Sequence, residues 1–385
     1  MIDISVARSP SETWLIKCIF FMFYCATIFL SIPSLRMVGY IVSSVAILFM
    51  IFAVVARSFL TWKIKRFEIP LVFLVLWYLF LSFIHRDFDG LYQTLQLLFV
   101  ILAFMYSVRY GNCYPGLILT YINLLLLIVA GADILIGNQF NISLAVRNHQ
   151  KSIYSNPNVT GAIVFLVLTN SMLADLRHHK VLKNLLFLLG ILLVILSQSR
   201  SVYLGVFAFG VTWAIYPRLK SKGLQKGFFL GVVVLLGGFL YLYAKQSYLI
   251  DFLNNGVFRL TNKNFYSGRE QFWGYLITDI IHEPFFGYGP SATPFKLIDV
   301  PLSSHNLYLQ IGIQSGIPGI VLIIIFFYRL FLIFVRSSSS DGQLGAAIVM
   351  FTMIHQMFEV SLTQNNLGIG LLVWLPLGIL CSRLI

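Results

Sequence analysis

The chain has 385 residues, of which 58% are hydrophobic and only 11% are charged. Soluble domains carry roughly 25% charged residues, because a surface in contact with water needs them. So few charges exclude an ordinary soluble globule and favour a bundle of membrane-spanning helices. The formal net charge is +13, but the Lys and Arg residues lie in short segments between apolar runs, without interleaved aromatic residues. We therefore expect no nucleic-acid partner and ascribe the basic balance to membrane topology.

Apolar runs that approach the length of a membrane span follow one another along most of the chain. We predict an all-α, polytopic transmembrane helical bundle of about 12 helices, forming a single integral membrane domain over residues 1–385. The first run contains Lys17 and lacks a small-residue cleavage site, so we interpret it as a retained helix and not as a signal peptide. The runs lie at about 14–31, 37–56, 69–85, 91–107, 115–137, 159–176, 181–198, 201–217, 227–245, 316–336, 342–360 and 366–383.

The distribution of Lys and Arg between these runs predicts the orientation of the bundle. If both termini are cytoplasmic, the short inner loops are rich in Lys and Arg, as in residues 63–66 and 218–226. The outer side carries fewer, and many of them fall in one long segment, which counts little in the positive-inside rule. We therefore predict a multi-pass protein with both termini in the cytoplasm.

Two outer segments are unusually polar. Residues 138–158 are rich in Asn and His, and residues 246–303 form the only long hydrophilic stretch of the chain. The longer segment mixes aromatic and charged residues and has a helix-like pattern near 269–282. Because long ordered loops are usually functional, we expect 246–303 to pack over the bundle as a cap carrying short helices.

Two arginines lie where a cation needs either an anion or water. Arg200 follows the run 181–198 within Ser-Gln-Ser-Arg-Ser. Its guanidinium could bind phosphate or carboxylate in a polar cavity, or it could reach the outer headgroups. Arg269 begins the expected helix near 269–282, where it could bind an anion, be solvated or pair with Glu270.

His305 lies where the long outer segment returns to the membrane, in Ser-Ser-His-Asn. A lone histidine is more often structural than catalytic, but histidine titrates near neutral pH and is therefore a candidate base. The sequence Gly-Ile-Pro-Gly at 316–319 should break the next helix, so that residues 306–315 form a re-entrant segment or a short half-helix. Broken helices at membrane depth occur where they line a cavity.

His355 and Glu359 are four residues apart, so within the run 342–360 they would share one helix face, as a functional or a structural pair. The chain contains no glycine-rich phosphate loop with Lys-Ser/Thr, no HExxH and no Asp-x-Asp in its outer segments. Its four cysteines form no CxxC. We therefore expect neither a metal nor a cofactor, and a metal-dependent sugar transferase is disfavoured.

Residues 267–319 contain S-G-R-E-x-x-W, then E-P-F-F-G-Y-G, then S-S-H-N, and nine residues later G-I-P-G. Together with S-N-P-N at 155–158 and S-Q-S-R-S at 197–201, this pattern resembles the O-antigen ligase/polymerase superfamily. These are bacterial enzymes that act on undecaprenyl-linked glycans at the periplasmic face. The His-Asn pair with its downstream G-x-x-G is the most specific part of the resemblance.

The resemblance implies an inverting, metal-independent glycosyl transfer from an undecaprenyl-pyrophosphate-linked glycan, with the active site on the periplasmic side of the bacterial inner membrane. It further implies that Arg200 and Arg269 bind the donor pyrophosphate and stabilise the leaving group. His305 would then position or deprotonate the acceptor hydroxyl. Further substrate-binding candidates are Arg147, His149, Lys151, Tyr266 and Asn306.

Two kinds of enzyme share these motifs. The short spacing between Arg269 and His305 favours an O-antigen polymerase of the Wzy type, whereas the His-Asn and G-x-x-G piece is typical of ligases that transfer the glycan to lipid A-core. A transporter of polyprenyl-linked sugars is a third possibility, but it would need internal symmetry that is not evident. The expected partners are undecaprenyl-pyrophosphate-linked glycans, membrane lipid and, for a polymerase, a chain-length regulator.

Overall fold

The structure, a computed structural model, describes residues 10–56, 63–113, 116–138, 153–154, 157–173, 180–245, 248–261 and 268–385. Over these ranges the chain forms helices and turns without a strand, which confirms the all-α prediction. The helices are α1 (Pro10–Ser31), α2 (Arg36–Ala56), α3 (Ile69–Ile84), α4 (Phe88–Tyr110), α5 (Gly116–Asn138), α6 (Pro157–Ser171), α7 (Lys180–Ser197), α8 (Arg200–Ile215), α9 (Lys222–Ala244), α10 (Tyr248–Thr261), α11 (Arg269–His282), α12 (Pro294–Ile298), α13 (Leu307–Arg336), α14 (Ser340–His355) and α15 (Leu367–Leu384).

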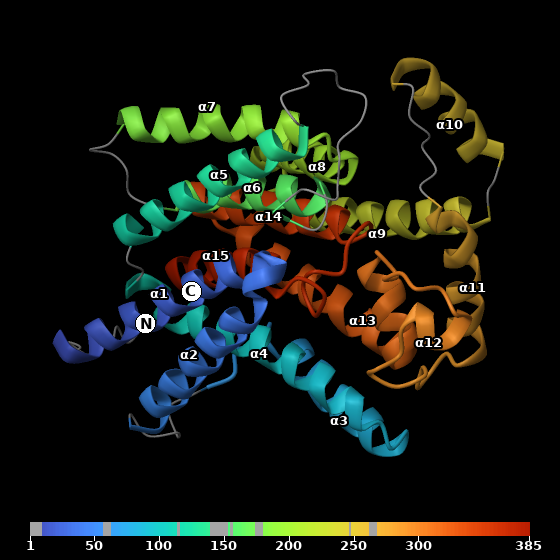
Figure 1. The fold of residues 1–385 in the computed structure, drawn as a ribbon, viewed down its shortest axis with the longest axis horizontal. Coiled ribbons are helices and arrows are strands. Elements are labelled where there is room, and N and C mark those ends of the chain that lie inside the picture. Colours follow the sequence, from blue (N-terminus) through green and yellow to red (C-terminus); the bar gives the residue numbers. More distant parts are fainter. Residues whose placement is uncertain are drawn as a thin grey trace.

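Each apolar run predicted from the sequence coincides with one of these helices (Figure 1). In the described part of the chain, 6 helices are long and apolar enough to cross a membrane: α1, α2, α4, α9, α13 and α15. Shorter apolar helices accompany them. The structure therefore confirms a helical protein with several membrane-capable segments, while the total of about 12 spans stays a prediction.

The helix α15 lies at the centre of the bundle and packs against α1, α4, α6 and α14 (Figure 1). Nearly all of its residues are buried. Trp374 is enclosed between two aromatic side chains, with ring centroids 5.3 Å from Phe104 of α4 and 5.5 Å from Phe326 of α13. By contrast, α9 lies at the edge of the bundle, with large apolar side chains such as Leu230 and Leu235 exposed.

Polar contacts between distant segments join residues that the sequence assigns to the same side. At the predicted inner end, the buried Glu68 forms an ion pair of 2.7 Å with Arg109. At the predicted outer end, the Asp87 carboxylate accepts the backbone N–H of Ser291 at 2.8 Å. These contacts support the prediction that successive loops alternate between the two ends of the bundle. Which end faces the cytoplasm stays a prediction.

The predicted outer segment 246–303 carries three short helices, α10, α11 and α12, which lie at one end of the molecule (Figure 1). The observed bounds of α11 match the helix predicted near 269–282. Its Trp273 is fully buried, packs against Tyr243 of α9 with tilted rings and 5.2 Å between centroids, and donates its indole N–H to the Ser304 carbonyl at 2.8 Å. Through this tryptophan, α11 fixes both α9 and the loop that contains His305.

The helix α13 is broken at Gly316, whose φ of 68° and ψ of −169° are not helical. The half-helix predicted before the Gly-Ile-Pro-Gly sequence is therefore confirmed. Backbone groups freed by such a break must find partners, because no water is available inside a membrane bundle.

A turn of the outer segment, residues 284–288, provides these partners. The Ile317 N–H donates to the Pro284 carbonyl at 2.8 Å, and the Tyr288 N–H donates to the Ile313 carbonyl at 2.7 Å. The E-P-F-F-G-Y-G and G-I-P-G motifs thus hold each other through their backbones, which fixes the turn 284–288 against the half-helix.

Gly316 cannot accept a side chain in this arrangement. A Cβ atom would lie 2.6 Å from the Pro284 carbonyl oxygen, and the positive φ is unfavourable for any other residue. We expect Gly316→Ala to destabilise the protein by about 1–3 kcal/mol, measured as a lower melting temperature in detergent. Gly238→Ala is the control, because a Cβ there meets nothing within 4 Å. Equal melting of both variants would contradict the proposed role of the break.

Asp87 should make the docking of the cap depend on pH. Burial would raise the pKa of Asp87, but hydrogen bonds from Ser291 and Gly90 and the charge of Lys296 outweigh burial and hold the pKa below its usual range. A depressed pKa means that the contact stabilises the fold above the free-Asp value, near 4, and is lost as the pH falls through the lower folded value.

We therefore expect amide hydrogen exchange in residues 284–300 of the wild type to accelerate as the pH falls below about 4, once the intrinsic pH dependence of exchange is subtracted. In Asp87→Asn, exchange should already be faster at neutral pH and should lack this additional acid response. Identical corrected exchange in the two proteins would show that Asp87 does not hold the cap.

Candidate functional site

Two of the predicted site residues meet around a carboxylate at the predicted outer end. The Glu359 Oε2 atom lies 3.7 Å from His305 Nδ1, a separation suited to an ion pair although longer than a hydrogen bond. Arg269, the first residue of α11, donates through Nη1 to the Phe358 carbonyl at 3.0 Å. Arg269 and His305 therefore flank the same short loop, which follows α14.

Three neighbouring groups, His305, Arg269 and His355, influence Glu359 electrostatically. The Glu359 side chain is only 12% exposed, and its burial would raise the pKa. The nearby His305, Arg269 and His355 outweigh that effect and hold the pKa of Glu359 below its usual range. The site therefore contains a carboxylate that stays ionised at neutral pH beside an imidazole and a guanidinium.

The loop after α14 has its shape because Gln356 ties its two ends together. The Gln356 side chain accepts the Ser361 N–H at 3.1 Å and donates to the Ser361 hydroxyl at 2.8 Å. The backbone carbonyl of Gln356 accepts the N–H of Leu307, the first residue of α13, at 2.8 Å. This loop therefore bulges toward the start of α13, which brings Glu359 to His305.

The sequence-based pairing of His355 with Glu359 on one helix face is wrong. The helix α14 ends at His355, not near residue 360 as the apolar run predicted, so Glu359 lies in the following loop. The His355 ring instead stacks on Phe351, 5.4 Å between centroids. The polar run at 361–366 is the sequence signal that this region is a loop. No local pattern indicates that Glu359 turns toward His305.

Asn158 and Ser199 form a chain of hydrogen bonds that links Glu359 to the segment containing Arg200. Asn158, in the first turn of α6, donates its amide to Glu359 Oε1 at 3.0 Å and accepts the Ser199 hydroxyl at 2.8 Å. Ser199 caps α8, whose first residue is the exposed Arg200. The S-N-P-N, S-Q-S-R-S and S-S-H-N motifs, far apart in sequence, thus meet at one place.

The remaining predicted site residues have different positions. Asn306 is fully buried and caps α13, accepting the Leu309 N–H at 3.0 Å. Within the residues that the structure describes, no group of His, Cys, Asp and Glu is arranged to hold a metal ion. Four further substrate-binding candidates lie outside the described residues, namely Arg147, His149, Lys151 and Tyr266.

Two comparisons with known proteins show what the chain is similar to. Residues 185–324 match a family model described as O-Antigen ligase, and this span includes Arg200, Arg269, His305 and the break at Gly316. The chain is also 24% identical over 376 residues to the ComP-specific O-oligosaccharyltransferase of Acinetobacter baylyi. That alignment covers 88% of this chain and 65% of the relative's length. The motifs, the family match and this relative together support a relationship of the chain to the O-antigen ligase superfamily.

Proposed function

We propose that this chain is a glycosyltransferase that moves an oligosaccharide from an undecaprenyl-pyrophosphate-linked donor to a hydroxyl acceptor. The observation that carries the proposal is the convergence of Arg269, His305 and the ionised Glu359 at one end of a membrane bundle. We further propose that this end faces the periplasm of a bacterial inner membrane and that both termini are cytoplasmic, as the distribution of basic residues indicates.

The proposed chemistry assigns a separate task to each side chain. With Nδ1 directed to Glu359, the Nε2 atom of His305 can accept the proton of the acceptor hydroxyl, while Glu359 orients the ring and stabilises its charged form. The acceptor oxygen then bonds to the anomeric carbon from the face opposite the leaving group, and the bond from that carbon to the phosphate oxygen breaks. The released undecaprenyl pyrophosphate carries additional charge, which Arg269 and Arg200 would stabilise.

The acceptor distinguishes three forms of this reaction. The compact spacing of Arg269 and His305 favours a polymerase, which adds repeat units to a lipid-linked chain. The family model described as O-Antigen ligase favours transfer of a finished glycan to lipid A-core. The relative's name, ComP-specific O-oligosaccharyltransferase, raises a third form in which a protein accepts the glycan.

One experiment separates these forms and tests the reaction itself. In a deletion strain, loss of a polymerase leaves single repeats on the lipopolysaccharide core, and loss of a ligase leaves bare core with accumulated lipid-linked polymer. Loss of a protein transferase leaves the lipopolysaccharide ladder intact and removes glycan from an acceptor protein. Re-expression of the chain should restore the missing product.

We expect Arg200→Ala, Arg269→Ala and His305→Ala each to reduce that product by about 100-fold or more, with normal amounts of protein in the membrane. Arg269→Lys should also be impaired, because the lysine ammonium does not replace a bidentate contact from the guanidinium. Arg259→Ala is the control, since Arg259 is an exposed cation of α10 and lies, like Arg269, in the segment 246–303. Normal glycan in all three alanine variants would contradict the proposal and favour transport without chemistry.

Glu359 should act on turnover more than on donor binding, because it contacts His305 and not the pyrophosphate. Glu359→Gln keeps the size of the side chain and an oxygen for the Asn158 amide, but it removes the charge. We expect kcat to fall by about 10-fold to 100-fold with little change in KM for the donor. Glu283→Gln serves as the control, because Glu283 is an exposed carboxylate after α11. Unchanged kcat would exclude a role for Glu359 through His305.

A further inference from the structure

The backbone of His305 has a conformation that most residues avoid. Its φ is 47°, in the left-handed region, where the Cβ atom crowds the following carbonyl oxygen. This conformation costs a residue other than glycine on the order of 1–2 kcal/mol, and it persists only where the surrounding structure imposes it. Because φ sets the direction in which the side chain leaves the backbone, the contacts that impose it also aim the imidazole at Glu359.

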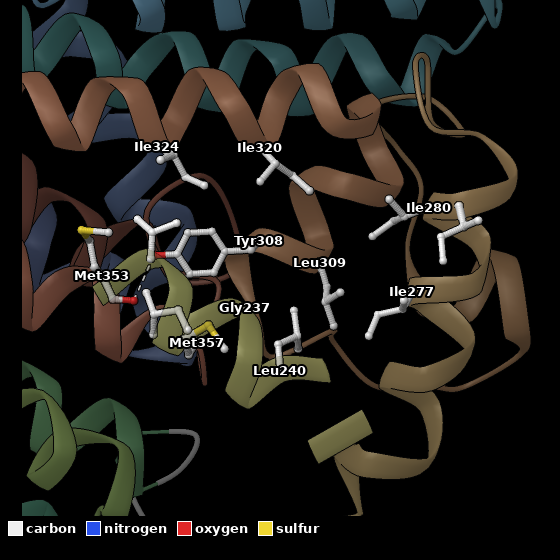
Figure 2. Close-up of a pocket in the computed structure, with 13 residues that line it drawn as sticks. Gly237, Leu240, Ile277, Ile280, Tyr308, Leu309, Ile320, Ile324, Met353 and Met357 are labelled. Atoms are coloured by element: carbon white, nitrogen blue, oxygen red, sulfur yellow. Dashed lines mark hydrogen bonds between the residues drawn. The ribbon is translucent and has the colours of Figure 1, made fainter. Parts of the chain in front are cut away.

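Contacts on both sides of His305 fix the neighbouring residues. The Ser304 carbonyl accepts the indole N–H of Trp273 at 2.8 Å. The half-helix of α13 is held by α14, since the Tyr308 hydroxyl donates to the Met353 carbonyl at 3.0 Å. Figure 2 shows this bond at an apolar pocket of about 240 Å³ that both residues line. These contacts place the two flanks of the turn, and neither of them involves the backbone of His305 itself.

The backbone N–H of His305 is held by Ser303. It donates to the Ser303 hydroxyl oxygen at 3.2 Å, only two residues earlier in the chain. A local bond of this kind closes a tight turn, but it fixes the turn only if the hydroxyl has a fixed position. Ser303 is only partly buried, so packing alone does not set its rotamer. The hydroxyl therefore needs a second partner.

Asn365 is this second partner. Its side-chain Nδ2 donates to Ser303 Oγ at 2.7 Å, across 62 residues of sequence. Asn365 lies in the loop between α14 and α15 and has a φ of 62°, a conformation that asparagine adopts more readily than most residues. Its side chain is exposed, whereas Gln364 and Asn366 on either side are buried. An exposed amide between two buried neighbours thus contacts the segment of His305.

The buried neighbours fix the backbone of Asn365. The Gln364 side chain accepts the amide of Gln314, in the first half of α13, at 3.1 Å. The Asn366 side chain caps α15 by accepting a backbone N–H at 3.2 Å. The amide of Asn365 therefore reaches Ser303 from a backbone that is anchored on both sides.

We propose that Asn365 is a positioning residue for His305 and acts through the Ser303 hydroxyl. The proposal rests on the proposed function, in which the His305 imidazole takes the proton of the acceptor hydroxyl. The connection between α14 and α15 then holds His305 at two points, because Glu359 faces the ring and Asn365 secures the backbone turn. A displacement of about 1 Å can cost about 100-fold in rate, so this link controls turnover without a contact to either substrate.

Replacing Asn365 by glycine isolates the effect of its amide. Glycine adopts a φ of 62° without strain, so Asn365→Gly removes the hydrogen bond and lets the loop keep its path. We expect kcat to fall about 10-fold, with little change in KM for the undecaprenyl-pyrophosphate-linked donor. Asp299→Gly is the matched control, because Asp299 is also exposed, at the end of α12, with a φ of 54°. This control should keep the kcat of the wild type.

Variants of Ser303 test whether Asn365 acts through the proposed bond. Ser303→Ala should lower kcat as Asn365→Gly does, and the double variant should be no slower than either single variant, since both remove the same link. Ser303→Thr keeps the hydroxyl oxygen and should retain most of the turnover. If Asn365→Gly does not accumulate in the membrane, Ser303→Ala provides the same test. Unchanged kcat in Asn365→Gly, or losses that multiply in the double variant, would overturn the proposal.

Chemical modification tests the position of His305 without glycosyl transfer. Its side chain is only 24% exposed in the ion pair with Glu359, so diethyl pyrocarbonate should modify it slowly. Relative to the exposed His282 as internal reference, modification of His305 should be several-fold faster in Asn365→Gly and unchanged in Asp299→Gly. Equal relative rates in all three proteins would overturn the proposal. Faster modification in a protein that transfers no glycan would support the hold on His305 and contradict the proposed function, so the two failures are distinguishable.

Discussion

The arrangement of the site depends on the backbone contact between the turn 284–288 and the break at Gly316. In a membrane, an interrupted helix is stable only if its freed N–H and carbonyl groups find partners in the protein. Here Pro284 and Tyr288 provide them, through hydrogen bonds to Ile317 and Ile313. This single contact sets the position of the half-helix that follows His305 and the position of α11, which begins with Arg269.

The same break also separates a polar environment from an apolar one. Because α13 changes direction at Gly316, its first half presents Tyr308 and its second half Ile320 to one apolar pocket. His305 stays outside the pocket, beside Glu359. The half-helix of α13 therefore runs from the charged site to an apolar pocket whose lining contains no charged side chain, since desolvating a charge there would be costly.

Much of this architecture could be predicted from the sequence, because it rests on strong local signals. Long apolar runs gave the helices, the Gly-Ile-Pro-Gly sequence predicted the break, and the pattern near 269–282 predicted α11. Glu359 could not be placed in the same way. Its run of apolar residues continues to about 360, but the helix stops at His355 because Gln356 closes a loop with Ser361. A tertiary contact of this kind overrides the helical period and has no local sequence pattern.

The link from Asn158 to Glu359 could likewise not be predicted, since about 200 residues separate them, too many for any spacing rule. The motifs were recognisable one by one, whereas their convergence is a property of the bundle. The family match and the relative are similarities of sequence and leave the acceptor to experiment.

The most direct test of the central claim is an experimental structure of the protein with undecaprenyl pyrophosphate bound in a lipid nanodisc. We expect the pyrophosphate within hydrogen-bonding distance of the Arg269 guanidinium, on the side where Glu359 of the loop after α14 faces His305 of the segment before α13. A pyrophosphate bound at the opposite end of the bundle, or one that leaves Arg269 and His305 without contact, would contradict this account.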